Sequence, residues 1–128
     1  MTPTEDRRRR RSNDPLVALH YQLTQTRQDA HLDAIVVADP SGFVVAGAGA
    51  WPICEELAAY APLLAQRGVW SEPEIEGGSR MAELKPEIDV RAVDIEALSV
   101  LLCARGGWMR AKAIEQAASG VARILGAR

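Results

Sequence analysis

The hydrophobic positions of the chain recur at helical spacing in three places. The first stretch, residues 13–30, begins with a candidate cap and a proline and carries Leu16, Leu19 and Leu23 on one face. The last stretch, residues 109–125, shows the same period and ends at Gly126. These patterns predict amphipathic helices at both ends of a folded domain.

A second helix is expected after the aromatic entry Trp51-Pro52. Its apolar stripe consists of Ile53, Leu57, Tyr60 and Leu64. Pro62 lies inside this pattern, where its ring removes one backbone hydrogen bond, so we expect a kink or a break there.

Short apolar runs predict five strands, which are Leu32–Ala38, Phe43–Ala46, Ser79–Lys85, Ile88–Ile95 and Leu98–Ala104. Residues 69–78 form an acidic connection before the third strand. The order is α-β-β-α-β-β-β-α, and the short links between neighbouring strands favour an antiparallel sheet with helices on its faces. The fold class is therefore α+β.

The turn Asp39-Pro40-Ser41-Gly42 joins the first two strands and is followed by the small residues Gly47–Ala50. Proline and glycine suit a turn, and Asp39 can bond the backbone of the turn. A phosphate-binding loop would need further glycines or a lysine, and Pro52 stands where a dinucleotide fingerprint has its third glycine. We interpret Gly47–Ala50 as a close approach between backbones rather than a phosphate site.

The charge of the chain is unevenly distributed. Among 128 residues, Arg7–Arg11 form one basic run, whereas residues 12–128 carry 10 basic and 15 acidic side chains, a net charge of −5. We expect residues 1–12 to be a disordered basic arm and residues 13–128 to be a single domain. An acidic body argues against nucleic-acid binding.

Neither export nor membrane insertion is indicated by the sequence. The arm has no apolar segment next to its arginines, and no window is long and apolar enough to form a transmembrane segment. Cys54 and Cys103 lack Cys-x-x-Cys spacing and lie in apolar patterns, which favours core packing over redox sensing. We expect a cytoplasmic protein.

Catalytic and metal-binding patterns are not found in the sequence, so we expect neither an enzyme nor a cofactor. His20 and His31 lie in or beside the first helix, where His31 suits a helix end and His20 a surface. The carboxylates from Glu72 to Glu96 alternate with apolar residues, as on the solvated side of strands, rather than forming an acid/base pair.

Three tryptophans lie at boundaries between the expected elements. These residues are Trp51, Trp70 and Trp108. A large amphipathic ring at such a position can cap the core or anchor a partner, and the sequence leaves both roles open.

Two segments carry a resemblance to a known family. The strand-turn-strand LDAIVVADPSGFVVAGAG and the final LSVLLCARGG with AKAIEQAASGVARIL resemble the Roadblock/LC7 family over about residues 14–126. Asp33 departs from the family, which often has glycine before the first strand. The resemblance implies a roadblock/profilin-like fold, in which a five-stranded antiparallel sheet lies between a pair of helices and a single helix.

The resemblance also implies a homodimer in which the second helices pack together and the third strands pair. Carried onto this chain, the second helix is residues 53–66. The expected dimer or partner interface consists of Trp51, Ile53, Glu56, Tyr60, Leu63 and Trp70.

The function implied by the resemblance is a regulator or scaffold of a Ras-like small GTPase, or of a second roadblock protein. Some bacterial members activate a GTPase by reshaping it, so the resemblance assigns no catalytic residue. The alternative from a different class is a small-molecule sensor of related topology, with Gly47–Ala50 lining its pocket.

Overall fold

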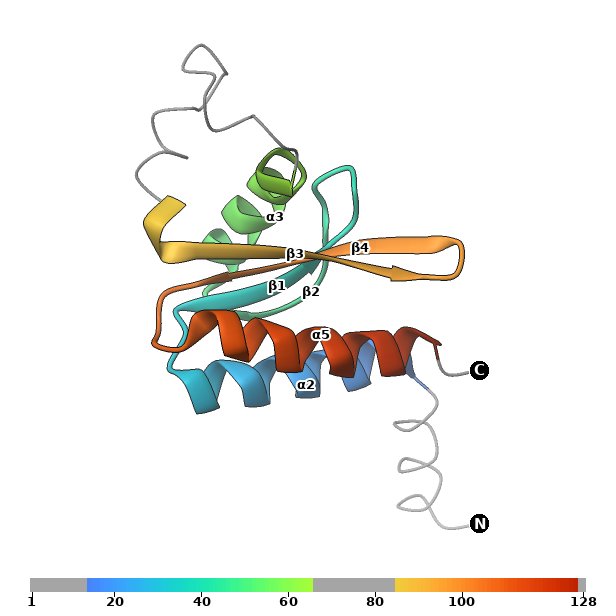
Figure 1. Cartoon of the computed structure of the whole chain (residues 1–128), viewed down its shortest axis with the longest axis horizontal. Coiled ribbons are helices and arrows are strands. Elements are labelled where there is room, and N and C mark those ends of the chain that lie inside the picture. Colours follow the sequence, from blue (N-terminus) through green and yellow to red (C-terminus); the bar gives the residue numbers. More distant parts are fainter. Residues whose placement is uncertain (1–13, 66–84, 127–128) are drawn as a thin grey trace.

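The computed structural model describes residues 14–65 and 85–126. The predicted basic arm (1–12), the acidic connection (69–78) and most of the predicted third strand lie outside these residues. Two helices, a four-stranded sheet and a third helix form three layers in the described part (Figure 1).

Helix α2 (Pro15–Ala30) begins and ends as the sequence predicts. The Asp14 carboxylate accepts a hydrogen bond from the Leu16 amide (3.0 Å), which satisfies one of the free amides of the first turn. His31 is the C-cap in a left-handed conformation, and its amide donates to carbonyls of the last turn. Helix α5 (Arg110–Gly126) packs beside α2 on the same face of the sheet.

The sheet contains β1 (Ala34–Ala38), β2 (Val44–Gly49), β3 (Ile88–Ile95) and β4 (Leu98–Arg105). Its order is β2-β1-β4-β3, and every neighbouring pair is antiparallel. The prediction of a strand reaching Lys85 is wrong at that residue, because Lys85 begins a short 3-10 helix, η2 (Lys85–Glu87). The other residues of the predicted third strand lie outside the described ranges, so a fifth strand stays a prediction.

Strand β1 lies at the centre and separates two hydrophobic clusters. Ile35 and Val37 face the cluster under α2 and α5, while Val36 faces the cluster under the single helix α3 (Trp51–Ala65). All five residues of β1 are buried, as expected for a strand that is covered on both sides. The predicted layers, a pair of helices on one face and one helix on the other, are present (Figure 1).

Helix α3 continues through Pro62 to Ala65, so of the two alternatives predicted at this proline the break is wrong and the kink stays a prediction. Only three residues of α3 follow Pro62, and Ala61 and Leu64 on either side of it are buried in the α3 cluster. Packing of this last turn against the sheet therefore outweighs the loss of one backbone hydrogen bond.

Candidate functional site

The sequence-predicted interface lies on and around α3, and its residues differ in how much surface they offer. The side of α3 that faces the sheet is formed by Cys54, Leu57, Ala58, Ala61 and Leu64. Ile53, Tyr60 and Leu63 are half-buried and pack against the same cluster. The buried side of α3 therefore differs from the apolar stripe predicted by the sequence, because Ile53 and Tyr60 lie at the border of the core instead of at its centre.

Two aromatic rings stand out beside α3. Trp51, at the first position of the helix, is 52% exposed, and Phe43 at the end of the hairpin turn is 70% exposed. Gly42, next to Phe43, lies so near α3 that an added Cβ would be in ordinary contact with the backbone of Ala58 and Ala59. The hairpin turn thus contacts the middle of α3 and presents Phe43 nearby, a residue that sequence reasoning assigned to a strand.

Charge on α3 is acidic. Glu55 is exposed and Glu56 is half-buried, and residues 51–65 contain no lysine or arginine.

Five of the six predicted interface residues lie on α3, which spans residues 51–65. Trp70 lies outside the described residues.

The hairpin turn is satisfied by its own side chain, as predicted. Asp39 Oδ1 accepts hydrogen bonds from the amides of Ser41 (2.9 Å) and Phe43 (3.1 Å), and Gly42 has a positive φ of 95°. The small residues after it serve close packing: a Cβ on Gly47 would lie 3.1 Å from the Cys54 Sγ. At Gly49 an added Cβ would lie 2.7 Å from the Asp33 carbonyl oxygen, so the predicted close approach between backbones is confirmed at Gly49, whereas Gly47 packs on side chains.

Both cysteines are buried free thiols in the α3 cluster. Burial, with a smaller contribution from the nearby Asp89 charge, raises the pKa of Cys103 to about 12. Burial also raises the pKa of Cys54, with the Arg27 charge acting in the opposite direction. Since a thiolate is the reactive form, neither cysteine is prepared for nucleophilic chemistry.

The histidines and the acidic side chains do not come together in a metal-binding group. His20 Nδ1 lies 3.1 Å from the Gly47 carbonyl oxygen, and His31 caps α2. Within residues 14–65 and 85–126, no three His, Cys, Asp or Glu side chains are grouped so that they could hold a metal. In the same part of the chain, no helix is long and apolar enough to cross a membrane.

A cluster of charges fixes the corner where β4 turns into α5. Arg110 donates through Nε to Asp89 Oδ2 (2.9 Å) and through Nη1 and Nη2 to the carbonyls of Gly106 and Pro86. Arg105 Nε lies 3.8 Å from a carboxylate oxygen of Asp33 and an equal distance from one of Glu87. The cluster joins η2 and the ends of three strands, and we interpret it as structural.

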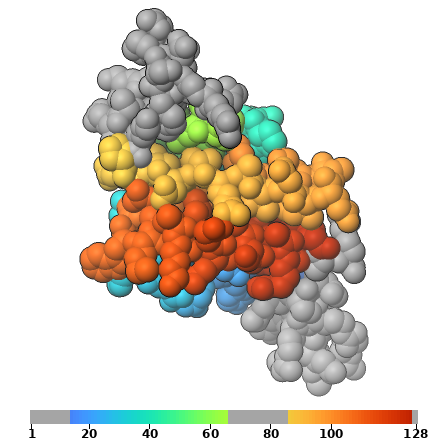
Figure 2. Space-filling model, in the orientation of Figure 1, coloured from blue at the N-terminus to red at the C-terminus, as the bar shows by residue number. Residues whose placement is uncertain are grey.

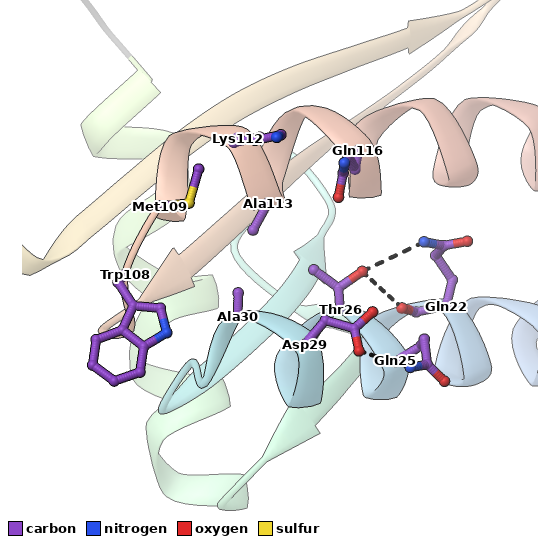
Figure 3. Close-up of a pocket in the computed structure, with 10 residues that line it drawn as sticks. All are labelled: Gln22, Gln25, Thr26, Asp29, Ala30, Trp108, Met109, Lys112, Ala113 and Gln116. Carbon is purple, nitrogen blue, oxygen red and sulfur yellow. Dashed lines mark hydrogen bonds between the residues drawn. The ribbon is translucent and has the colours of Figure 1, made fainter.

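A groove of about 280 Å³ runs between α2 and α5, on the opposite face of the sheet from α3 (Figure 3). Gln22, Gln25, Thr26, Asp29 and Ala30 line it from α2, and Trp108, Met109, Lys112, Ala113 and Gln116 line it from α5 and the corner before it. Sequence reasoning missed this groove, because the polar positions of two separate helices gave no sign that they face each other.

Trp108 stands at one end of the groove and does not cap the core. Its side chain is 68% exposed, and its ring meets His31 edge-on with centroids 5.2 Å apart. Of the two roles that the sequence left open for this tryptophan, capping the core does not fit such exposure, and contact with a partner stays a prediction.

Comparisons with known proteins identify the fold. The sequence matches no protein-family model and no curated protein. Among solved structures, MglB of Myxococcus xanthus superposes with a TM-score of 0.54 at 12% identity, over 86% of this chain and 89% of that one. The gliding protein MglB of Thermus thermophilus gives 0.53 at 17% identity, over 86% and 90%. MglB is a roadblock/LC7-family protein, so the chain folds as a roadblock-like domain.

Proposed function

We propose that this protein is a non-catalytic, dimeric regulator or scaffold of a Ras-like small GTPase, or of a second roadblock protein. The similarity to MglB over most of both chains supports the proposal, since MglB is a roadblock-family regulator of a small GTPase. The side of α3 that faces away from the sheet carries aromatic and acidic side chains and supplies a surface for such a partner.

The dimer interface in this proposal follows α3. Half-buried Ile53, Tyr60 and Leu63 form this interface, and exposed Trp51 extends the interface at the start of the helix. Large apolar side chains that are only partly covered gain from burial against a second protein. The other element that the resemblance assigns to the dimer is the third predicted strand, residues 79–85, of which residues 79–84 lie outside the described ranges. Strand β3, which is the fourth predicted strand, lies at an edge of the described sheet and across the front face (Figure 2).

The chain contributes no catalytic group in this proposal. Regulation then consists of holding a GTPase in one conformation through differential binding, which requires a surface but no nucleophile or acid/base pair. The raised pKa values of both thiols agree with this assignment.

A pull-down with the full chain from its native cytoplasm tests the proposal. We expect capture of a Ras-like GTPase or of a second roadblock protein, identified by mass spectrometry. The Tyr60→Arg variant should lose the captured protein, whereas the matched control Ser119→Arg, at an exposed position of α5, should retain it. Retention by both variants would place binding away from α3.

The sensor alternative has less support. It needs Gly47–Ala50 beside a pocket, but Gly47 packs on Cys54, and Gly49 packs on the backbone of residues 33 and 34. Native mass spectrometry of the purified chain separates the two functions, because a co-purified small molecule would favour the sensor.

A further inference from the structure

The α5 wall of the groove carries polar side chains that have no hydrogen-bond or ion-pair partner in the described part of the chain. Within the described residues, no hydrogen bond or ion pair engages Lys112 or Gln116, and the Trp108 indole N–H has no acceptor. Met109 beside it is 67% exposed. A cation and an amide without partners in the described part of the domain therefore border one groove, together with the exposed side chains of Met109 and of Trp108, whose ring also meets His31 edge-on.

The corner before α5 holds these apolar side chains outward. Met109 has a positive φ of 55°, which is uncommon and strained for a residue other than glycine. The Trp108 amide donates to the Ala30 carbonyl (3.3 Å), and Gly107 lies too close to this carbonyl for a side chain. The backbone thus fixes Trp108 in an exposed position, where it can act as a preorganised anchor.

The α2 wall has a different character, because its donor groups already make hydrogen bonds within the helix. The Thr26 hydroxyl donates to the Gln22 carbonyl (2.9 Å), and Gln25 Nε2 donates to Asp29 Oδ1 (2.9 Å). The second Asp29 oxygen remains an acceptor for N–H groups. The floor between the walls is formed by Ala30 and Ala113, whose small side chains leave room for a ligand (Figure 3).

The spacing along the groove matches an extended polypeptide. Lys112 and Gln116 are four residues apart on α5, so their Cα atoms are about 6 Å apart along the axis. Side chains on one side of an extended chain recur every ~6.7 Å. Trp108 lies in the corner before α5 begins, at the end of the groove, so the helical spacing applies to Lys112 and Gln116.

We propose that the α2/α5 groove binds an extended segment of a partner protein through three alternate side chains. An apolar residue contacts Trp108 and Met109, an acidic residue two positions on pairs with Lys112, and a polar residue two positions further contacts Gln116. Asp29 accepts backbone N–H groups of the segment. Charge selects the occupant, because Lys112 is the one cation lining the groove and has no carboxylate of its own among the described residues.

This site goes beyond the proposed function. It lies on the face of the sheet opposite α3, so one chain can hold a peptide segment and a partner at α3 at the same time. The two proposals fail independently: Tyr60→Arg should weaken association at α3 and leave peptide binding unchanged.

The test is an NMR titration of the ¹⁵N-labelled full chain. The probes are the capped peptide Ala-Leu-Ala-Glu-Ala-Gln-Ala and its reversed sequence, each paired with a version in which lysine replaces glutamate. Trp108→Phe assigns the indole signal. We expect one orientation of the glutamate peptide to shift the Trp108 indole and the amides of Lys112 and Gln116, and to bind about fivefold more tightly than its lysine version, which corresponds to about 1 kcal/mol for an exposed ion pair.

A charge reversal makes the test specific. Lys112→Glu should reverse the preference and favour the lysine peptide, whereas Arg123→Glu, the same charge change at an exposed site near the other end of α5, should leave it unaltered. Melting curves of the two variants show that both fold. The proposal would be overturned by equal binding of the glutamate and lysine peptides, by chemical-shift changes outside the groove, or by no chemical-shift change at millimolar peptide. Groove shifts that follow protein concentration without peptide would also overturn it, by showing a second copy as the occupant.

Discussion

Gly49 at the end of β2 packs directly on the backbone of Asp33: a Cβ added to Gly49 would lie 2.7 Å from the Asp33 carbonyl oxygen. The same atom would lie 2.9 Å from the Ala34 Cα, and Gly49 has a positive φ of 117°. Neither neighbour can move without shifting the central strand β1, so the pairing of β2 with β1 requires glycine here.

Gly49→Ala should therefore destabilise the domain by about 2 kcal/mol, from the strained φ and the clash with main-chain atoms. Chemical denaturation followed by circular dichroism measures the loss. Gly47→Ala is the matched control, because an added Cβ there meets the Cys54 side chain at 3.1 Å and Gly47 has no positive φ. Equal losses in both variants would show that backbone strain at Gly49 does not matter.

Local chemistry made much of this fold predictable. In the Asp-Pro-Ser-Gly turn, the Asp39 side chain accepts the hydrogen bonds of the turn amides. Ile88–Ile95 is a strand with the predicted bounds. The helix around Pro62 was harder, since its continuation depends on tertiary packing of Ala61 and Leu64 that no local signal reveals. The groove was missed for a related reason: Thr26 and Gln116 are polar residues on separate helices, and only the packing of α2 against α5 brings them together.

Stability should fall at alkaline pH through Cys103. Burial, helped by the Asp89 charge, raises the pKa of this thiol from 9.0 to about 12. The native state then holds the proton more tightly than the unfolded state, so the stabilisation is complete below pH 9 and is lost as pH rises toward 12. The free energy of unfolding, measured between about pH 8 and 11, should decline more steeply in the wild type than in Cys103→Ala. Parallel slopes in the two proteins would contradict this origin.

The Arg110 contacts should matter more than the ion pair between Arg91 and Glu115. Arg110 is mostly buried and donates to one carboxylate and two carbonyls, so Arg110→Ala should cost about 2 kcal/mol. The Arg91 pair is 46% and 60% exposed, and solvent screening limits its contribution to about 0.5 kcal/mol. Urea titrations of both alanine variants measure the difference. A similar loss in Arg91→Ala would contradict the structural role of the corner cluster.

A dimer through α3 is expected in solution. Sedimentation equilibrium at micromolar concentration should give twice 13.9 kDa. Tyr60→Arg should weaken the dimer, because symmetry brings two cations together and removes an aromatic contact. Tyr60 is half-buried, so Ala59→Arg, at an exposed position of α3, repeats the test without touching the core. A wild-type monomer well above micromolar concentration would remove the dimer from the proposed function.

The basic arm Arg7–Arg11 should tune association without contributing to the fold. Five cations next to a body of net charge −5 can steer an acidic partner, and such attraction acts on the association rate. Exposed charge pairs add typically less than about 1 kcal/mol each and weaken as salt shortens the screening length to ~10 Å at 0.1 M. Deleting residues 1–12 should therefore leave the melting temperature nearly unchanged and slow partner binding at low salt, measured by stopped-flow. Identical rates for both forms would leave the arm as a solubilising tail, and a melting temperature many degrees lower would show that it belongs to the fold.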